Sequence, residues 1–268
     1  MILYSLPLAG QQDPRISGAL HRLSKEAAGL WQVAPGFTGR ESVHQKALAR
    51  KGRDIGPTFQ TRDIESFYAL GAFKGAPEAL REFRHILLVD GKAIDDEKSA
   101  RRAFETQLLS GQDAVKETLR KDFEKTCLAG SATDFGQLIL LFTNANLAKY
   151  SFEFGGESRL GADNAWQIAF TQLAGDQSLH VSEGHRKIVE KLQGEIWSRP
   201  GDFLPLRIVL NSRRQRDKNE IRDEAMVDYM VVAPALLPAS LVYRRYVNGA
   251  LLLESVYRYS DWQPVGAP

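Results

Sequence analysis

The chain has 268 residues, of which 43% are hydrophobic and 25% are charged, with a formal net charge of +2 at pH 7. These proportions are typical of globular proteins and exclude extended disorder, and the length suits one large domain or two small ones. So small a net charge does not by itself indicate a nucleic-acid or anionic-membrane partner. Cys127 is the only cysteine, which excludes a disulfide within the chain. No apolar run reaches about 18 residues, so no membrane-spanning helix is predicted.

The first twelve residues are interpreted as a possible remnant of a signal peptide. Residues 1–10 are apolar and end in small residues, as the regions before signal cleavage sites do. An ordinary strand or a disordered end is the alternative. Export predicts a periplasmic or secreted protein, whereas a mature chain that truly starts at Met1 would be cytoplasmic.

The first predicted element after this segment is a helix. Asp13 supplies an N-cap and Pro14 occupies the first turn. Apolar residues recur at helical spacing through Leu30, and Pro35-Gly36 ends the pattern.

The next part of the chain is predicted to contain strands. Residues 50–63 are basic and rich in turn formers, which predicts a loop, and Asp90-Gly91 predicts a tight turn. Three short strand patterns lie around these segments, at residues 37–48, 66–73 and 82–89.

A helical region follows. Residues 95–129 have helical periodicity, and Ser110-Gly111 is expected to divide them into two helices. Cys127 lies on the apolar stripe of the second helix, so we expect a buried, inert side chain rather than a nucleophile.

A third helix is expected to complete this region. Ser131 and Asp134 resemble a capping box, and an apolar run follows them. Residues 95–147 are therefore predicted to form a helical insertion.

From Tyr150 onward, apolar residues alternate with polar ones, which is typical of strands. Gly155-Gly156 is interpreted as a turn, and Asn248-Gly249 is a strong hairpin signal. The pattern predicts about six or seven antiparallel strands in a meander. The expected fold is α+β: a curved antiparallel sheet, or open half-barrel, with helices packed on its concave face, in a single domain over residues 13–268.

Seven apolar residues of these strands are candidate ligand contacts, because their alternation can direct them to one concave face. The alternative is an ordinary core that the helices close. The seven residues are Trp166, Ile168, Phe170, Leu206, Ile208, Tyr229 and Leu253.

No catalytic motif accompanies the predicted sheet. Asp134-Phe135-Gly136 matches a protein-kinase tripeptide, but no catalytic loop or Gly-rich loop precedes it, so a capping role is preferred. His180 and His185 lack the helical spacing of paired metal ligands. We therefore predict no catalytic residue, no metal site and no cofactor, and expect that the chain is not an enzyme.

A basic cluster in the second half is interleaved with acidic residues. Side chains of both charge signs at a hairpin tip predict a solvated turn rather than a nucleic-acid site. The basic residues are Arg213, Arg214, Arg216, Lys218 and Arg222, and the acidic ones are Asp217, Glu220, Asp223 and Glu224.

One hairpin resembles a known family. Residues 194–200 (Gly-Glu-Ile-Trp-Ser-Arg-Pro) and 205–208 (Pro-Leu-Arg-Ile) resemble the G-x-[IL]-W-x-x-P…P-x-R-[IV] hairpin of lipoprotein-carrier (LolA-like) half-barrels. Residues 237–240 are similar to that family's entry into the last hairpin. Residues 89–92 resemble the strand and turn that precede the helices in uncharacterised secreted bacterial proteins of this type. The resemblance covers about residues 66–262. It implies an exported half-barrel that binds acyl chains or other lipids without catalysis or cofactor, and it assigns no individual ligand contact.

The leading hypothesis is therefore an exported, non-enzymatic protein that binds a hydrophobic ligand, either a lipid or a lipoprotein acyl chain, or an envelope protein. A structural or interaction module with a filled core is the first alternative. A hydrolase with an unrecognised site is the second, and a perturbed carboxylate or histidine in a cleft would favour it.

Overall fold

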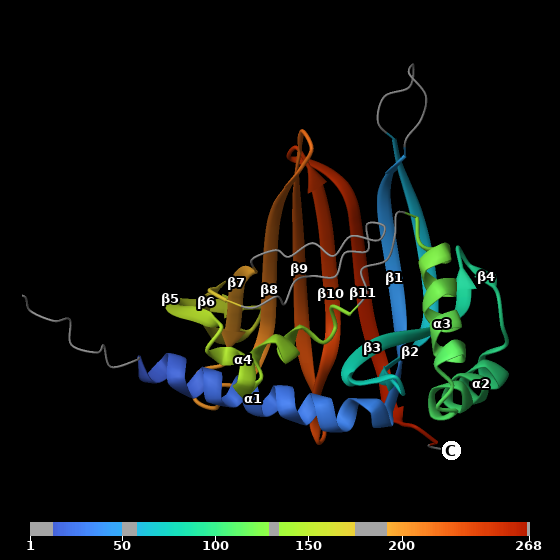
Figure 1. Ribbon diagram of the computed structural model, residues 1–268, viewed down its shortest axis with the longest axis horizontal. Helices are drawn as coiled ribbons and strands as arrows, with labels where there is room; N and C mark the ends of the chain where they lie inside the picture. The colour runs from blue at the N-terminus through green and yellow to red at the C-terminus, as the bar shows by residue number, and fades with distance from the viewer. Residues whose placement is uncertain (1–12, 50–57, 129–133, 175–191, 267–268) are drawn as a thin grey trace, which may run out of the picture.

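The computed structural model describes residues 13–49, 58–128, 134–174 and 192–266. In these ranges the chain forms one eleven-stranded sheet, in the order β4-β3-β2-β1-β11-β10-β9-β8-β7-β6-β5. Neighbouring strands are antiparallel and the sheet is not closed (Figure 1). The predicted fold class, α+β with a curved antiparallel sheet and packed helices, is confirmed.

The elements follow one another from helix α1 to strand β11. The helices are α1 (Pro14–Val33), η1 (Ala34–Gly36), α2 (Glu97–Leu109), α3 (Asp113–Thr126), η2 (Leu138–Phe142) and α4 (Asn144–Leu147), η denoting a 3-10 helix. The strands are β1 (Phe37–Ala49), β2 (Thr58–Phe73), β3 (Ala76–Val89), β4 (Lys92–Ala93), β5 (Tyr150–Leu160), β6 (Asp163–Gln172), β7 (Gln193–Ser198), β8 (Pro205–Arg216), β9 (Asn219–Val232), β10 (Ala235–Val247) and β11 (Ala250–Pro264).

Helix α1 begins as predicted. The Asp13 carboxylate accepts a hydrogen bond from the backbone N–H of Arg15 at 2.9 Å, and Pro14 fills the first helical position. The apolar stripe of the helix is buried, and the helix lies across the strands, contacting β5, β8 and β10 (Figure 1). Its buried residues are Ile16, Ala19, Leu20, Leu23, Ser24, Ala27 and Leu30.

The first three strands belong to the same sheet as the second half of the chain, because β1 pairs with both β2 and β11. The predicted strand ranges lie within β1, β2 and β3. The loop predicted over residues 50–63 is wrong from Thr58 onward, where β2 begins. Thr58 pairs with Ala49 and Ile64 with Val43, so backbone pairing with β1 overrides the turn-rich composition.

The second half, where about six or seven strands are predicted, contains seven, β5 to β11, in the described residues. Of the two predicted glycine turns, one is present and one is not. Asn248 and Gly249 have φ angles of 50° and 80°, as the predicted tight hairpin requires. Gly155-Gly156 does not form a turn: the register of β5 against β6 shifts between Phe154 and Gly156, so an extra residue bulges within the strand. The turn between β5 and β6 lies at Gly161 instead.

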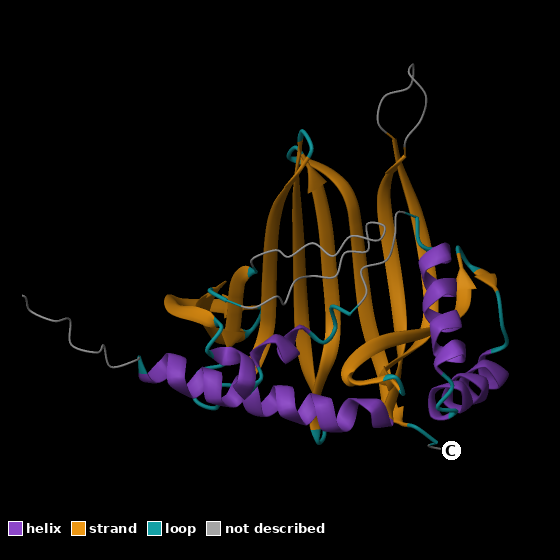
Figure 2. Cartoon of the chain, in the orientation of Figure 1, coloured by secondary structure: helices purple, strands orange, loops and turns teal. Residues whose placement is uncertain are grey.

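The predicted helical region divides into two parts with different positions (Figure 2). Helices α2 and α3, separated at Ser110-Gly111 as predicted, pack against β2 and β3. The third predicted helix is wrong: only the 3-10 helix η2 and the short α4 form there. Asp134 has a φ of 65° and bonds to β3 rather than capping a helix, and Ser131 lies outside the described residues.

None of the helices in the described ranges combines the length and the apolarity that a membrane crossing requires.

Candidate ligand-binding surfaces

The structure brings the predicted ligand contacts together on one face of the sheet, which we call the inner face. Five of the seven are buried in a single hydrophobic core with α1: Ile168, Phe170, Ile208, Tyr229 and Leu253. Leu206 is half-buried and packs against this core.

The remaining predicted contact, Trp166, is half-buried at the margin of the inner face. Its ring centroid lies 6.3 Å from that of Phe154 and 5.7 Å from that of Phe203. Phe203 in turn lies against α1 at Gly18, so a cluster of aromatic rings in edge-on and tilted contact connects β6 to the helix.

The segment around η2 completes the cover of the inner face. The Phe142 ring lies 5.0 Å from Phe170 and 5.3 Å from Tyr150, centroid to centroid. The Tyr229 hydroxyl oxygen accepts a hydrogen bond from the backbone N–H of Ile139 at 3.0 Å. Burial raises the pKa of Tyr150 to about 12. At these positions the inner face is occupied by the protein's own side chains.

A charged cluster that the sequence analysis missed lies beside this core. The Arg84 guanidinium donates to both carboxylate oxygens of Glu41, at 2.7 and 2.8 Å, and to Glu82 at 2.9 Å. All three side chains are almost completely buried, and Arg84 also stacks 4.3 Å from the Phe123 ring. Burial raises the pKa of Glu82. Alternation along β3 puts residues 82 and 84 on one face, which is the one signal that sequence offers for this pair.

Glu82 also fastens the segment that leads into η2. Its carboxylate accepts hydrogen bonds from the backbone N–H groups of Asp134 and Gly136, both at 2.8 Å, and from the Tyr68 hydroxyl at 2.9 Å. In return, the Asp134 carboxylate accepts from the Glu82 N–H at 3.1 Å and pairs with Arg81 at 2.8 Å.

These reciprocal hydrogen bonds give Asp134 and Gly136 a structural role, so the Asp-Phe-Gly tripeptide does not require a kinase-like function. A Cβ on Gly136 would lie 2.8 Å from Glu82 Oε1 and from the Tyr68 hydroxyl, so only glycine fits this approach. The Phe135 ring packs 5.1 Å from that of Tyr243 in the core. The predicted helix-capping role of Asp134 is replaced by a contact with β3.

A second buried carboxylate lies near the β8–β9 hairpin. Asp223 is completely buried and accepts hydrogen bonds from Arg214 at 2.9 Å, from the Tyr243 hydroxyl at 2.7 Å and from Arg245 at 2.7 Å. The prediction of a solvated mixed-charge tip is therefore wrong for Arg214 and Asp223. Strand alternation turns these two inward, where opposite charges compensate each other. Arg213, which pairs with Glu220 at 3.6 Å, is exposed as predicted.

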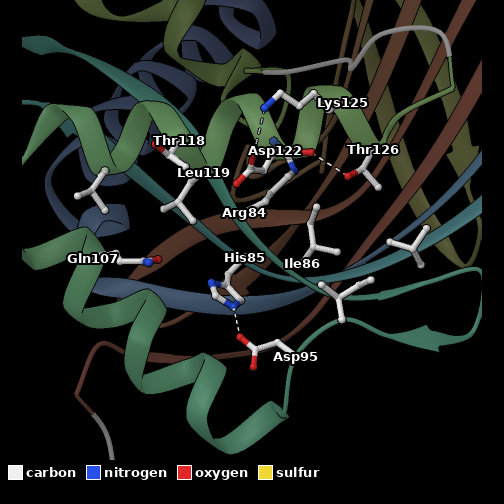
Figure 3. Close-up of a pocket in the computed structure, with 13 residues that line it drawn as sticks. Arg84, His85, Ile86, Asp95, Gln107, Thr118, Leu119, Asp122, Lys125 and Thr126 are labelled. Atoms are coloured by element: carbon white, nitrogen blue, oxygen red, sulfur yellow. Dashed lines mark hydrogen bonds and ion pairs between the residues drawn. The ribbon is translucent and has the colours of Figure 1, made fainter.

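A cavity of about 670 Å³ lies between β3, α2 and α3, and we call it the outer cleft (Figure 3). None of the seven predicted contacts lines it. The ring nitrogen Nε2 of His85 lies 2.9 Å from the Asp95 carboxylate, and this hydrogen bond lowers the pKa of Asp95.

The outer cleft contains the perturbed carboxylate that would favour a hydrolase, but its threonines are not activated. The Thr118 and Thr126 hydroxyls donate to the helix carbonyls of Ala114 and Asp122. A nucleophile would instead need its hydroxyl within hydrogen-bond reach of a base. The cleft is better suited to binding than to acyl transfer.

Neither Cys127 nor a metal site adds chemistry to these surfaces in the described residues. Cys127 is buried, as predicted, and burial raises the pKa of its thiol to about 12. Among the described residues no group of three or more His, Cys, Asp or Glu could hold a metal ion. His180 and His185 lie outside those residues.

Comparisons with known proteins give distant structural neighbours only. No family model matches the chain, and no curated protein sequence matches it. A DUF1329 family protein from Desulfovibrio piger is similar with a TM-score of 0.39 and 10% identity, over 96% of each chain. A putative outer membrane lipoprotein-sorting protein domain from Vibrio parahaemolyticus is similar with a TM-score of 0.36 and 9% identity, over 93% of this chain and 94% of the other. The description of the second neighbour agrees with the predicted distant resemblance to LolA-like proteins, but similarity this low supports no conclusion about family, ligand or partner.

Proposed function

We propose that this protein is an exported, non-enzymatic binding protein that takes up a hydrophobic ligand, an acyl chain or lipid, between the inner face of its sheet and α1. The observation that supports the proposal is the way the cover is attached. In the described ranges no backbone hydrogen bond joins α1 to a strand. The helix is held by apolar side chains, so it can leave the inner face without breaking any strand pairing. A ligand with the same apolar character can then take its place.

Gly18 offers a way to loosen this cover. A Cβ at this position would lie 2.6 Å from Phe203 Cζ, so a larger side chain must displace the Phe203 ring, push α1 away from the β7–β8 loop, or both. Gly29, on the same helix, has nothing within 4 Å of the corresponding Cβ position. The two glycines therefore form a matched pair, because both substitutions raise helix propensity but only the one at Gly18 disturbs the contact between α1 and Phe203.

The test combines native mass spectrometry of gently extracted protein with titration of a fluorescent fatty acid. We expect co-purified lipid in the wild-type protein, and an affinity for the fatty acid that rises several-fold in Gly18→Leu but not in Gly29→Leu. A bare polypeptide in repeated extractions, together with no binding by either variant, would refute the proposal.

The second candidate, an interaction module with a filled core, is favoured by the position of Phe142. This ring already occupies the space between Tyr150 and Phe170 that an acyl chain would need. If this candidate is correct, Gly18→Leu lowers the melting temperature without creating any affinity for the fatty acid.

A further inference from the structure

The hairpin of β9 and β10 ends in a group of exposed apolar residues, which we call the apolar tip. The sequence carries no charged residue from position 229 to position 243, a stretch that contains the end of β9, the turn and the start of β10. At their opposite ends the same strands have polar turns, Asp217-Lys218 and Asn248-Gly249. The apolar tip consists of Met230, Val231, Ala233 and Pro234.

The apolar tip is exposed on both faces of the hairpin. Met230 and Val231 are successive residues of β9, so their side chains point to opposite faces. They are 40% and 62% exposed. A folded protein that docked against one face would leave the other face in water, whereas a lipid bilayer surrounds a tip that enters it.

The backbone of the apolar tip is also suited to an apolar medium. Val232 pairs with Ala235, so only two residues lie outside the strand ladder, and one of them, Pro234, has no N–H group. Unpaired N–H and C=O groups are costly in hydrocarbon. A short turn that closes directly on paired strands keeps that cost low.

The charge at the base of the apolar tip is compensated. Asp228 pairs with Arg207 at 2.5 Å and accepts a hydrogen bond from the Ser240 hydroxyl at 3.0 Å. Helix α1 crosses the strands at this end of the sheet and contacts β10, and the β9–β10 turn extends beyond the helix (Figure 1). The apolar tip therefore projects past the cover of the inner face.

We propose that the apolar tip docks the protein on a lipid bilayer by entering the boundary between headgroups and acyl chains. Four residues expose much less surface than the about 800 Å² that each partner buries in a stable protein–protein complex. The same four can support a weak, reversible attachment to a bilayer, because this binding scales with the apolar area buried. The proposal goes beyond the proposed function and does not rest on it, since docking needs no ligand in the half-barrel.

The test is co-sedimentation of the full chain with phosphatidylcholine vesicles. We expect the wild-type protein to bind, and to bind equally at low and high salt, because no charge takes part. Val231→Asp should weaken binding by about tenfold or more, since a carboxylate is costly below the headgroups. Leu109→Asp, at a residue of α2 that is 72% exposed, is the matched control and should bind as the wild type does.

Two further variants separate insertion from a loss of folding. Ala233→Trp should strengthen vesicle binding several-fold, because it adds a side chain that favours the membrane interface. Val231→Cys can be labelled with an environment-sensitive fluorophore, since Cys127 is buried. Its emission should shift to the blue when vesicles are added, whereas the same label on Leu109→Cys should not respond.

Several outcomes would overturn the proposal. These are a wild-type protein that stays in solution at every lipid concentration, binding that disappears at high salt, and unaltered binding by Val231→Asp. A dimer in lipid-free solution that Val231→Asp dissociates would overturn it too, because the apolar tip would then bind a second copy. Without vesicles, Val231→Asp should bind the fluorescent fatty acid as the wild type does, so a failure of docking would leave the proposed function unaffected.

Discussion

At the scale of single residues, the most constrained side chain is Arg84. A buried guanidinium costs several kcal/mol of desolvation, and only excellent geometry offsets this. Glu41 and Glu82 provide that geometry from two strands, while the Phe123 ring covers one planar face of the guanidinium. Removing the arginine would leave two carboxylates buried without a counter-charge.

We therefore expect Arg84→Met to lower the free energy of unfolding by about 3–5 kcal/mol. The matched control is Lys121→Met, since Lys121 is 60% exposed and pairs with Glu117 at 3.7 Å. That change should stay within about 0.5 kcal/mol. Urea unfolding of both variants at pH 7 measures the difference, and equal effects would contradict the role given to Arg84.

The cluster of Arg84, Glu41 and Glu82 could be predicted from the sequence only in part. Alternation along β3 indicates that Glu82 and Arg84 share a face, but burial of charged residues runs against composition rules. Glu41 comes from β1, and its approach depends on the pairing of three strands. The Asp223 cluster was missed for the same reason. Charges of both signs near a hairpin predict a solvated turn, and only the strand pairing shows that Arg214 and Asp223 are buried.

At the scale of elements, Asp113 joins two of them. It is the first residue of α3, and its carboxylate accepts hydrogen bonds from the backbone N–H groups of Lys74 and Gly75, at 2.7 and 2.9 Å. These two residues form the turn between β2 and β3. One side chain thus attaches the helix that walls the outer cleft to the hairpin beneath it.

The Asp113 contact predicts a pH dependence. Hydrogen bonds from Gly75 and Lys74 lower the pKa of Asp113, so the folded protein holds this proton less tightly than the unfolded chain does. The stabilisation is therefore fully present above the unfolded pKa of about 3.9, begins to fall below it, and is lost as the pH falls through the folded pKa. We expect Asp113→Asn to be less stable than the wild type at pH 7, and the difference to be smaller at pH 3. Urea midpoints at the two pH values measure this, and a constant difference would contradict it.

Sequence patterns predicted an element correctly where residues adjacent in sequence determine it. Asn248-Gly249 imposes its turn through backbone angles that few other residues adopt, and Asp13-Pro14 starts α1 from its own side chains. The prediction of a third helix was wrong because the Asp134 carboxylate accepts a hydrogen bond from β3, which is distant in sequence, instead of capping a helix. The prediction of a turn at Gly155-Gly156 was wrong because glycine is common both in turns and in β-bulges, so the sequence alone does not distinguish the two.

At the scale of the whole molecule, the pairing of β1 with β11 joins the strands of the first and second halves of the chain into one open sheet. Within the second half, each strand pairs with its neighbour in sequence, so alternation and turns sufficed to predict the meander. The β1–β11 pairing joins the two ends of the chain, and nothing local encodes it. The same pairing places α1, which precedes β1, across the strands that follow it.

The burial of the inner face predicts that a charge introduced there destabilises the fold. Phe170 is 2% exposed and packs against Phe142 and Tyr150, so Phe170→Asp removes an aromatic ring and buries a carboxylate without a partner. We expect a loss of more than about 3 kcal/mol. Thr171→Asp, the next residue on β6, faces the opposite, exposed side and should cost at most about 1 kcal/mol. Thermal melts of the two variants compare the faces directly. A shift of one residue in register would exchange the two side chains, so a larger loss for Thr171→Asp than for Phe170→Asp would mean that Phe170 does not face α1 and η2.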